Sequence, residues 1–450
     1  MTIQEGESTW APPPHLRLWP DTARVDAAGR LWLGGVEAAQ LAREHGTPLY
    51  VYDEATIRAR CRAFRRAFAQ RWPASAVAYA GKAYLSPALC RILLDEELEL
   101  DAVSAGEVGL AVASGYPAER IHLHGNYKPE AELMAALDAG VGRVVVDSLE
   151  ELERLEALAR ERGRRVAIWL RLNPDVQTET HAAVRTGHAG SKFGLDHAAA
   201  DAAARRVTIS PWVELVGLHA HAGSQLLDVR PAARAIAFLC EAAAWLRAAH
   251  GLAIREISPG GGLGVAYWPG ETAPTVEAYA AAVTDALREG VARHGLEPPR
   301  LVVEPGRAIV ACAGVALYTV GPRKLVPDGT ALVAVDGGMG DNPRPALYGA
   351  RYFAALAERM TAPATERARI VGRYCESGDV LVEEIVLPLA RAGETLAIPV
   401  SGAYHLAMAS AYNLAPRPAV VFVADGRARL VRRRETLADL LRADVMDWTD

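Results

Sequence analysis

The stretch Val77-Ala-Tyr-Ala-Gly-Lys82-Ala-Tyr84 is a short apolar run that ends in a single lysine. Only four of the 49 cationic residues are lysines, so the other 45 are arginines. An ammonium, unlike a guanidinium, can lose its proton and attack a carbonyl as a neutral amine. Lys82 is therefore a candidate for Schiff-base chemistry, although a solvated lysine at a strand end explains this stretch equally well.

The run around Val77 is the first of eight short apolar runs of β type, which alternate with helical stretches rich in alanine, leucine and arginine. Strands that alternate with helices predict a parallel sheet with right-handed crossovers. Eight repeats within about 250 residues favour a closed TIM-type (β/α)8 barrel over an open doubly wound sheet. The predicted strands are Ala76–Ala80, Leu98–Val103, Ile121–His124, Arg143–Val146, Val166–Leu172, Leu215–His219, Ile254–Ile257 and Leu301–Val303.

The sequence on either side of the barrel has a different pattern. The first residues are polar and proline-rich, which predicts a loose tail, and a mixed strand and helix pattern follows them. Beyond the barrel, short β-like segments separated by Gly, Pro and Asp predict a second, mainly β domain. The predicted α/β organisation is a tail over residues 1–14, a segment contributing to the β domain over 15–48, the barrel over 49–310 and the β domain over 311–450.

Composition restricts the class of protein and its surroundings. The chain has 450 residues, a net charge of −5 and no basic block, so nucleic acid is not an expected partner. The N-terminus has no positive end before an apolar centre, and no apolar run approaches about 18 residues, so neither secretion nor membrane insertion is expected. The five cysteines are scattered and lack CxxC spacing, which predicts reduced thiols in a cytoplasm rather than disulfides or a zinc site.

Reactive or flexible residues follow nearly every predicted strand. Barrels of this kind build their site at the carboxyl ends of the strands, so these distant segments are expected to converge on one mouth. They are Lys82, Ser104 with Gly106-Glu107, Gly125-Asn126, Asp147-Ser148, Asn173-Pro174, His221 with Gly223-Ser224, Gly260-Gly261-Gly262, and Glu304-Pro-Gly306-Arg307.

The last two of these loops are candidates for an anion site. In Gly260-Gly-Gly-Leu-Gly264, the glycines let backbone N–H groups approach a phosphate, although a tight turn explains them equally well. Arg307 favours the phosphate interpretation because its guanidinium can grip a phosphate or a substrate carboxylate in fork geometry.

Glu304 and His221 are further candidates in the barrel. A carboxylate at the end of a buried strand needs a cationic or hydrogen-bonding partner, which can be Arg307 or a protonated heterocyclic nitrogen. His219 and His221 alternate on one strand and are conceivable metal ligands, but no carboxylate has matching spacing, so we predict no metal site. A flat cofactor ring on the His221 imidazole, with Ser224 donating to a phosphate, fits this segment better.

Three clusters in the second domain combine charged groups with phenols or a thiol. They are the loop Asp336–Gly349 with Arg344 and Tyr348, the segment Arg373–Asp379 with Cys375 and Glu376, and Ser401–Tyr404. Cys375 can donate a proton only if it is accessible and lies in partly polar surroundings. The carboxylates beside it in the sequence favour that role over inert packing.

Taken together, these motifs resemble those of the diaminopimelate decarboxylase family, in the pyridoxal-phosphate fold group that also contains ornithine decarboxylase and alanine racemase. The resemblance extends from about Leu16 to the C-terminus. It implies that Lys82 in YAGKAY forms a Schiff base with pyridoxal 5'-phosphate and that Cys375 in CESGD is the proton donor. The activity it implies is decarboxylation of meso-2,6-diaminopimelate to L-lysine and CO2, the last step of lysine biosynthesis.

The resemblance also implies roles for the other candidates. His221 would stack on the cofactor ring, Glu304 would face its pyridine nitrogen, and a homodimer would form shared active sites with the CESGD loop coming from the partner chain. The implied cofactor-binding residues are Lys82, His221, Ser224, Gly261, Gly262, Glu304, Gly306, Arg307 and Tyr404. The implied substrate-binding residues are Arg307, Arg344, Tyr348, Glu376 and Tyr404.

Five positions differ from the family pattern that the resemblance implies, and none removes a catalytic group. They are Tyr84 and Ala411 in place of Asn, Tyr127 and Pro129 at commonly polar positions, and His405 in place of Gly. Because we expect them near the mouth, a decarboxylase for another basic amino acid or for a carrier-linked acid is an alternative. A non-catalytic cofactor-binding regulator would be expected to lose Lys82 or Cys375, and a racemase would need acids or bases on both faces of the substrate carbon.

Overall fold

The structure is a computed structural model that describes residues 11–173 and 192–445. It divides into two compact units. The barrel unit consists of the described parts of Arg60–Val265 and Thr272–Ala308, and the sheet unit of the described parts of Met1–Ala59, Ala266–Glu271 and Ile309–Asp450. Among the described helices, none is both long and apolar enough to cross a membrane.

The barrel unit contains a closed barrel of eight parallel strands in the order β10-β11-β12-β5-β6-β7-β8-β9. The last strand, β12, pairs with the first, β5, through Val303 and Val77, which closes the ring. All eight strands coincide with the predicted apolar runs, so the TIM-type barrel is confirmed. The strands are β5 (Ser75–Ala80), β6 (Glu99–Ala102), β7 (Ile121–Leu123), β8 (Arg143–Val146), β9 (Val166–Arg171), β10 (Val213–His219), β11 (Glu256–Ser258) and β12 (Arg300–Val303).

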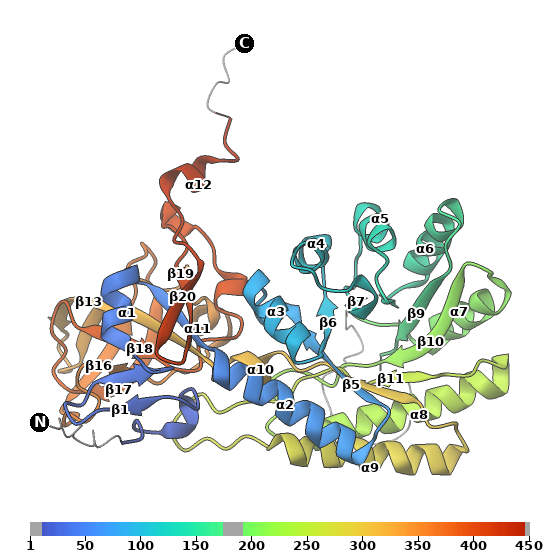
Figure 1. Cartoon of the computed structure of the whole chain (residues 1–450), viewed down its shortest axis with the longest axis horizontal. Coiled ribbons are helices and arrows are strands. Elements are labelled where there is room, and N and C mark those ends of the chain that lie inside the picture. The colour runs from blue at the N-terminus through green and yellow to red at the C-terminus, as the bar shows by residue number, and fades with distance from the viewer. Residues whose placement is uncertain (1–10, 174–191, 446–450) are drawn as a thin grey trace, which may run out of the picture. The chain divides into compact units, whose positions relative to one another are not determined.

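Helices follow the barrel strands and lie outside them, as α4–α7 show in Figure 1. A hydroxyl or carboxylate caps the first turn of several of these helices and fixes where each one begins. The elements are η2 (Gly81–Ala83), α3 (Pro87–Asp95), α4 (Ala105–Ala113), η3 (Ala118–Arg120), α5 (Glu130–Ala139), α6 (Leu149–Glu161), α7 (His197–Ile209), α8 (Arg230–His250) and α9 (Val276–His294), while α2 (Glu54–Arg71) and α10 (Arg307–Val310) include residues of both units.

The inside of the barrel is packed with side chains. Ala78, Val145, Trp169, Val216 and Val302 form one buried cluster. Trp169 fits because Gly217 lies beside its ring: a Cβ on that glycine would come within 2.6 Å of two indole atoms. The barrel is therefore a filled core rather than a channel, and its chemistry must lie at its ends.

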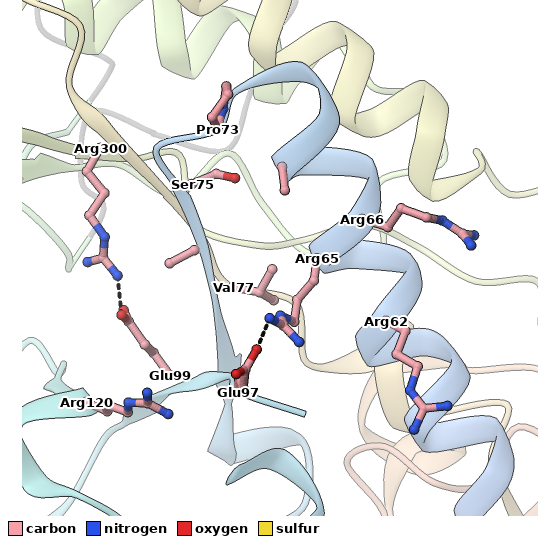
Figure 2. A pocket seen from close by; sticks show the side chains of 12 residues that line it. Arg62, Arg65, Arg66, Pro73, Ser75, Val77, Glu97, Glu99, Arg120 and Arg300 are labelled. Carbon is pink, nitrogen blue, oxygen red and sulfur yellow. Dashed lines mark hydrogen bonds and ion pairs between the residues drawn. The ribbon is translucent and has the colours of Figure 1, made fainter. Parts of the chain in front are cut away.

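The amino ends of β5, β6 and β12 surround a pocket of about 680 Å³ lined by arginines and glutamates (Figure 2). Arg65 pairs with Glu97 and Arg300 pairs with Glu99. These ion pairs lie at the opposite end of the strands from the loops that build sites in such barrels. The pocket contains none of the predicted site residues, so it is not the candidate active site.

The sheet unit has a nine-stranded sheet whose main path is β17-β16-β14-β13-β4-β19-β20, with β18 paired to β13 and β15 to β18. Its strands are β4 (Leu49–Asp53), β13 (Gly314–Leu325), β14 (Ala331–Val335), β15 (Ala355–Leu356), β16 (Glu366–Val371), β17 (Val380–Leu387), β18 (Thr395–Ile398), β19 (Ala419–Ala424) and β20 (Arg427–Arg432). The shorter elements are η1 (Leu16–Leu18), β1 (Arg24–Val25), β2 (Leu31–Leu33), β3 (Val36–Glu37), α1 (Ala38–His45), α11 (Arg344–Tyr348), η4 (Leu406–Met408), η5 (Tyr412–Leu414) and α12 (Leu437–Leu441).

The structure corrects the predicted boundaries at the N-terminal side. Strand β4 lies between β13 and β19 of the large sheet, so the sheet unit extends to residue 59 and the barrel does not begin at residue 49. Residues 15–48 belong to the sheet unit, but β1, β2 and β3 form a separate three-stranded sheet instead of adding a strand to the large one. Most of the predicted loose tail over residues 1–14 lies outside the described residues, although Ala11 bridges to Val25.

Candidate active site

Lys82 lies at the carboxyl end of the barrel, in the turn η2 that follows β5, and its side chain is exposed. The loop that carries Gly306 lies against this turn. Ala80 donates its backbone N–H to the Pro305 carbonyl at 3.2 Å, and a Cβ on Gly306 would come within 3.0 Å of the Ala80 and Ala83 methyl groups. The close packing of the two loops is what a glycine at position 306 permits.

Two acidic residues, Asp101 and Glu107, interact with the charge of Lys82. Asp101 was not among the residues predicted from the sequence. Burial raises the pKa of Asp101, at the end of β6, to about 7, while the Lys82 ammonium opposes the shift. Burial also raises the pKa of Glu107, again opposed by Lys82, and the Glu107 carboxylate accepts the Val103 N–H at 2.7 Å. The sequence did not indicate Asp101 because it lies inside the strand β6, whereas the predicted site residues follow the strand ends.

Glu304 is the centre of a buried hydrogen-bond cluster below the mouth. Its Oε1 accepts the Ser258 hydroxyl at 2.7 Å, and its Oε2 lies 3.1 Å from His219 Nε2. His124 Nε2 lies 3.7 Å from Oε1. Burial alone would raise the pKa of Glu304, but the two histidines and the hydroxyl outweigh it and hold the pKa well below its usual value. The carboxylate is thus kept ionised, by partners other than the predicted Arg307.

His219 and His221 have different neighbours although they are only two residues apart, because His219 ends β10 and His221 lies in the loop after it. His219 belongs to the Glu304 cluster, whereas His221 lies against the glycine loop: a Cβ on Gly260 would come within 2.5 Å of its Nδ1. Burial lowers the pKa of His221 to about 3, helped by the Lys82 charge, so the imidazole is neutral. A neutral imidazole is suited to packing against a flat ring.

His124, His219 and Glu304 place one possible ligand atom each within 4.8 Å of the others, all buried. The sequence pattern indicated His219 with His221 as conceivable metal ligands, but not His124. In the structure the direct hydrogen bond between His219 and Glu304 already accounts for two of these three groups.

The glycine loop and the two neighbouring loops form a backbone cradle. A Cβ on Gly261 would lie 1.9 Å from the Glu304 carbonyl oxygen, and one on Gly262 would lie 2.2 Å from the Gly223 carbonyl oxygen. Beside them, Arg307 is buried and donates from Nη2 to the Ser224 hydroxyl at 3.1 Å. The predicted phosphate-binding residues are therefore brought together by three loops that only glycines allow to approach so closely.

Other strand-end residues have structural roles. Ser104 and Ser148 cap helices, because the hydroxyl of each accepts the N–H three residues later. Lys128 is fully buried and donates to Glu151 and to the carbonyls of Gly125 and Val145, each at 2.7 Å. Asp147, next to Ser148, accepts the Gly194 N–H at 2.8 Å, while Pro174 lies outside the described residues.

The sheet unit holds the other candidates. Arg344, at the start of α11, is 7% exposed, and its guanidinium lies 4.8 Å from the Tyr267 ring centre and donates to the Tyr352 hydroxyl. Within the described parts of the chain it pairs with no carboxylate. Tyr348, at the other end of α11, is 66% exposed. A buried cation of this kind is costly unless an anion meets it. A guanidinium can bind a carboxylate through two parallel hydrogen bonds.

Cys375 and Glu376 are both exposed, on a loop that is anchored by Asp379. The Asp379 carboxylate accepts the backbone N–H groups of Met339 and Tyr374, at 2.6 and 2.8 Å. A pocket of about 660 Å³ is lined by residues that include Pro345 and Tyr352, after Arg344 in the chain, and Ser377 and Gly378, after Glu376. The thiol therefore meets the accessibility that a proton donor needs.

Tyr404 adopts a positive φ of 62° and is half-buried. The departures from the expected family pattern differ in exposure. Tyr84 and His405 are buried, Ala411 is half-buried, and Tyr127 and Pro129 are exposed. They therefore do not have equivalent surroundings. His405 contacts Tyr50 and Tyr352, which the sequence did not indicate.

Comparisons with known proteins identify the family of the chain that carries these barrel and sheet residues. A family model described as the pyridoxal binding domain of the pyridoxal-dependent decarboxylases matches residues 54–311. The chain is 48% identical over 441 residues to the diaminopimelate decarboxylase of Actinosynnema pretiosum subsp. auranticum, with 95% of each chain covered. It is 42% identical over 426 residues to that of Bacillus subtilis (strain 168), with 94% of this chain and 97% of the relative covered. The chain belongs to the diaminopimelate decarboxylase family.

A solved structure agrees with that membership. The crystal structure of the diaminopimelate decarboxylase of M. jannaschii in complex with L-lysine is similar with a TM-score of 0.89 and 34% identity, over 95% of this chain and 98% of that chain. This confirms the resemblance and the two-part fold expected from the motifs.

The residues of the barrel mouth fit the pyridoxal phosphate on which this family depends. His124 Nε2 and Asp101 Oδ1 are buried, lie 3.8 Å apart and form no hydrogen bond with any other residue in the described ranges. Buried polar atoms without partners are costly, so a polar ring with a ring nitrogen and a hydroxyl suits them. Lys82 offers an amine, and the glycine cradle with Ser224 offers hydrogen-bond donors for a phosphate.

Proposed function

We propose that this chain decarboxylates meso-2,6-diaminopimelate to L-lysine and CO2. The observation that carries the proposal is Arg344: a buried guanidinium with no carboxylate partner in the described chain, within a protein whose relatives are named diaminopimelate decarboxylase over nearly their full length. A substrate with a second amino-carboxylate end supplies the missing anion, which a simple diamine precursor such as ornithine does not supply at that end.

The barrel residues account for the handling of the cofactor. Pyridoxal phosphate, when bound, supplies an aldehyde that condenses with amines and a ring that accepts the electron pair released with CO2. The Lys82 amine would hold the aldehyde carbon, and Glu304, kept ionised by its neighbours, would keep a proton on the ring nitrogen. The neutral His221 would pack on the ring, while Ser224, Arg307 and the N–H groups around Gly261, Gly262 and Gly306 would bind the phosphate.

The sheet-unit residues account for the substrate and for the returned proton. Arg344 would bind the carboxylate of the end that is not decarboxylated, and Glu376 would bind the amine beside it. Arg307, Tyr348 and Tyr404 complete the proposed contacts. The exposed Cys375 thiol would give its proton to the carbon that has lost CO2, and the thiol can be reprotonated from solvent because it is accessible.

We infer that the enzyme is a cytoplasmic homodimer in which the Cys375 loop of one chain serves the barrel of the other. All five cysteines are free thiols, and three of them are buried, which supports a reducing compartment. A shared site makes a testable prediction: Lys82→Ala and Cys375→Ala proteins should each be inactive, but mixed dimers should each contain one intact site. Random mixing then restores about a quarter of wild-type activity, whereas unshared sites would restore none.

A substrate panel tests the function itself. Purified holoenzyme should release CO2 from meso-2,6-diaminopimelate, and L-lysine should be the product identified by chromatography. Release of CO2 from lysine, ornithine or arginine instead would move the assignment to the alternative, a decarboxylase of another basic amino acid. Borohydride treatment should attach the cofactor covalently to the wild-type protein but not to Lys82→Ala, as measured by mass spectrometry of the denatured protein. Covalent attachment that survives in Lys82→Ala would refute the lysine assignment.

A further inference from the structure

A chain of hydrogen bonds lies behind Arg344 and links it to a buried carboxylate. Arg344 donates to the Tyr352 hydroxyl, which lies 2.8 Å from His405 Nε2. His405 Nδ1 lies 3.2 Å from the Tyr50 hydroxyl, which donates to Asp341 Oδ2 at 3.0 Å. We call these five residues the Arg344 relay. Four of them are at most 1% exposed, so water does not replace these contacts.

The proton positions along the relay follow from its two charged ends. Burial raises the pKa values of Tyr50 and Tyr318 well above their usual range, so both phenols keep their protons. Both donate to Asp341 Oδ2, because a hydrogen bond to a carboxylate is stronger than one to an imidazole. Tyr50 then accepts from His405 Nδ1, and His405 Nε2 is left to accept from Tyr352.

This direction is consistent at every step, since each residue donates to the next from the cation to the carboxylate. Arg344 has no acceptor function, so Tyr352 must accept from it and can use its own proton for His405. A neutral His405 with its proton on Nδ1 is the one form that satisfies both neighbours. A glycine at this position would leave the two phenols on either side without a bridge.

The relay fixes a group that would otherwise be free to rotate. The Arg344 guanidinium lies over the Tyr267 ring at 4.8 Å, and one of its N–H groups is held by Tyr352. The Tyr352 ring is itself packed edge-on against Tyr267 and His405, with ring centres 5.3 and 5.1 Å away. The guanidinium plane is thus set before a ligand arrives, which reduces the entropy that binding would cost.

We propose that His405 is a positioning residue for substrate selection: through Tyr352 it orients Arg344 to grip the carboxylate of the substrate end that stays intact. The proposal rests on the function proposed above. It predicts that the relay affects only ligands that carry this carboxylate. L-lysine and cadaverine test this directly, because they have the same five-carbon diamine skeleton and differ only in that group.

The experiment compares binding of L-lysine and cadaverine to the holoenzyme by calorimetry. His405→Phe keeps an aromatic ring and removes both nitrogens, and Tyr352→Phe removes only the hydroxyl, so the second variant serves if the first does not fold. Tyr318→Phe is the matched control, because its equally buried hydroxyl donates to the same Asp341 without contacting His405. Steady-state kinetics with meso-2,6-diaminopimelate on the same variants separate KM from kcat.

We expect His405→Phe and Tyr352→Phe to weaken L-lysine binding about 10- to 100-fold, since one charge-assisted contact is misplaced. Cadaverine binding should change less than about 2-fold, KM should rise more than kcat falls, and Tyr318→Phe should alter none of these. Equal losses for both ligands, unchanged L-lysine binding, or a wild type that does not prefer L-lysine would each overturn the proposal.

Failure of the proposed function has a different signature. A wild type that prefers L-lysine to cadaverine, loses that preference on Tyr352→Phe, but does not decarboxylate meso-2,6-diaminopimelate would refute the substrate while leaving the relay intact. Turnover of meso-2,6-diaminopimelate, with variants that still prefer L-lysine to cadaverine as the wild type does, would refute the role of the relay and leave the proposed substrate intact.

Discussion

Removal of the Ser258 hydroxyl is the sharpest single test of how the barrel holds Glu304. The hydroxyl donates to Glu304 Oε1 at 2.7 Å and accepts the Gly260 N–H at 3.1 Å, so it joins the glycine loop to the carboxylate. Ser258 is fully buried. The change Ser258→Ala therefore deletes two contacts without leaving a large cavity and without removing a charge.

The expected cost follows from the nature of the two contacts. A hydrogen bond to an ionised, buried group contributes about 1.5–3 kcal/mol. The Gly260 N–H also loses its partner, although the loop can relax toward another acceptor. We expect the free energy of unfolding of the cofactor-free protein to fall by about 3 kcal/mol, and the pKa of Glu304 to rise because its ionised form loses a donor.

Urea unfolding of the cofactor-free protein measures this cost, and Ser401→Ala provides the matched control. Ser401 is as deeply buried, but its hydroxyl donates only to backbone carbonyls, that of Ile398 lying at 2.9 Å. A neutral contact of this kind contributes about 1 kcal/mol. Ser258→Ala should therefore cost clearly more than Ser401→Ala, and its pyridoxal phosphate affinity should fall as well. Equal costs for the two variants, with unchanged cofactor affinity, would refute the view that Glu304 is held ionised by its neighbours.

Three further changes have expected outcomes. Gly261→Ala should greatly weaken cofactor binding, measured by absorbance titration, because its Cβ would lie 1.9 Å from a carbonyl oxygen, whereas Gly109→Ala, with nothing within 4 Å, should stabilise the protein by up to about 1 kcal/mol. Lys128→Met should lower the free energy of unfolding by about 3–5 kcal/mol in urea, since it leaves Glu151 buried without its cation. Burial lowers the pKa of His219, so the unfolded chain binds more protons than the folded chain below about pH 6.5. The free energy of unfolding should therefore fall by up to about 1.4 kcal/mol per pH unit as the pH decreases. Urea titrations at several pH values measure this slope, which His219→Gln should reduce.

The barrel could be predicted because its signal is local. Each strand is a short, largely apolar run, and eight such runs that alternate with helical stretches favour the closed topology. Strand β4, Leu49-Tyr-Val-Tyr-Asp53, shows where this reasoning fails. All five of its residues are buried, as in a barrel strand, but its partners β13 and β19 are hundreds of residues away in sequence, and no local pattern identifies them.

The sequence nominated the candidate residues of the site but not the residues that support them. Lys82, His221, Glu304 and Arg307 end strands and carry chemistry that plain turns do not need. Ser104 and Ser148 satisfied the same criterion, yet they cap helices, because a serine after a strand is equally what a helix start requires. Position relative to a strand end therefore selects candidates but does not separate binding groups from caps.

The supports escape sequence reasoning for a physical reason that Glu304 and Arg344 share. A buried charge requires partners, so the sequence predicts that partners exist, but those partners come from other parts of the chain. His219 and Ser258 lie 85 and 46 residues from Glu304, and His405 reaches Arg344 only through Tyr352. Because such partners control charge and orientation without touching the substrate, substitutions there can change which substrate is accepted while every motif residue stays in place. His405 is one of these supports, so we expect substitutions at this position to alter substrate preference.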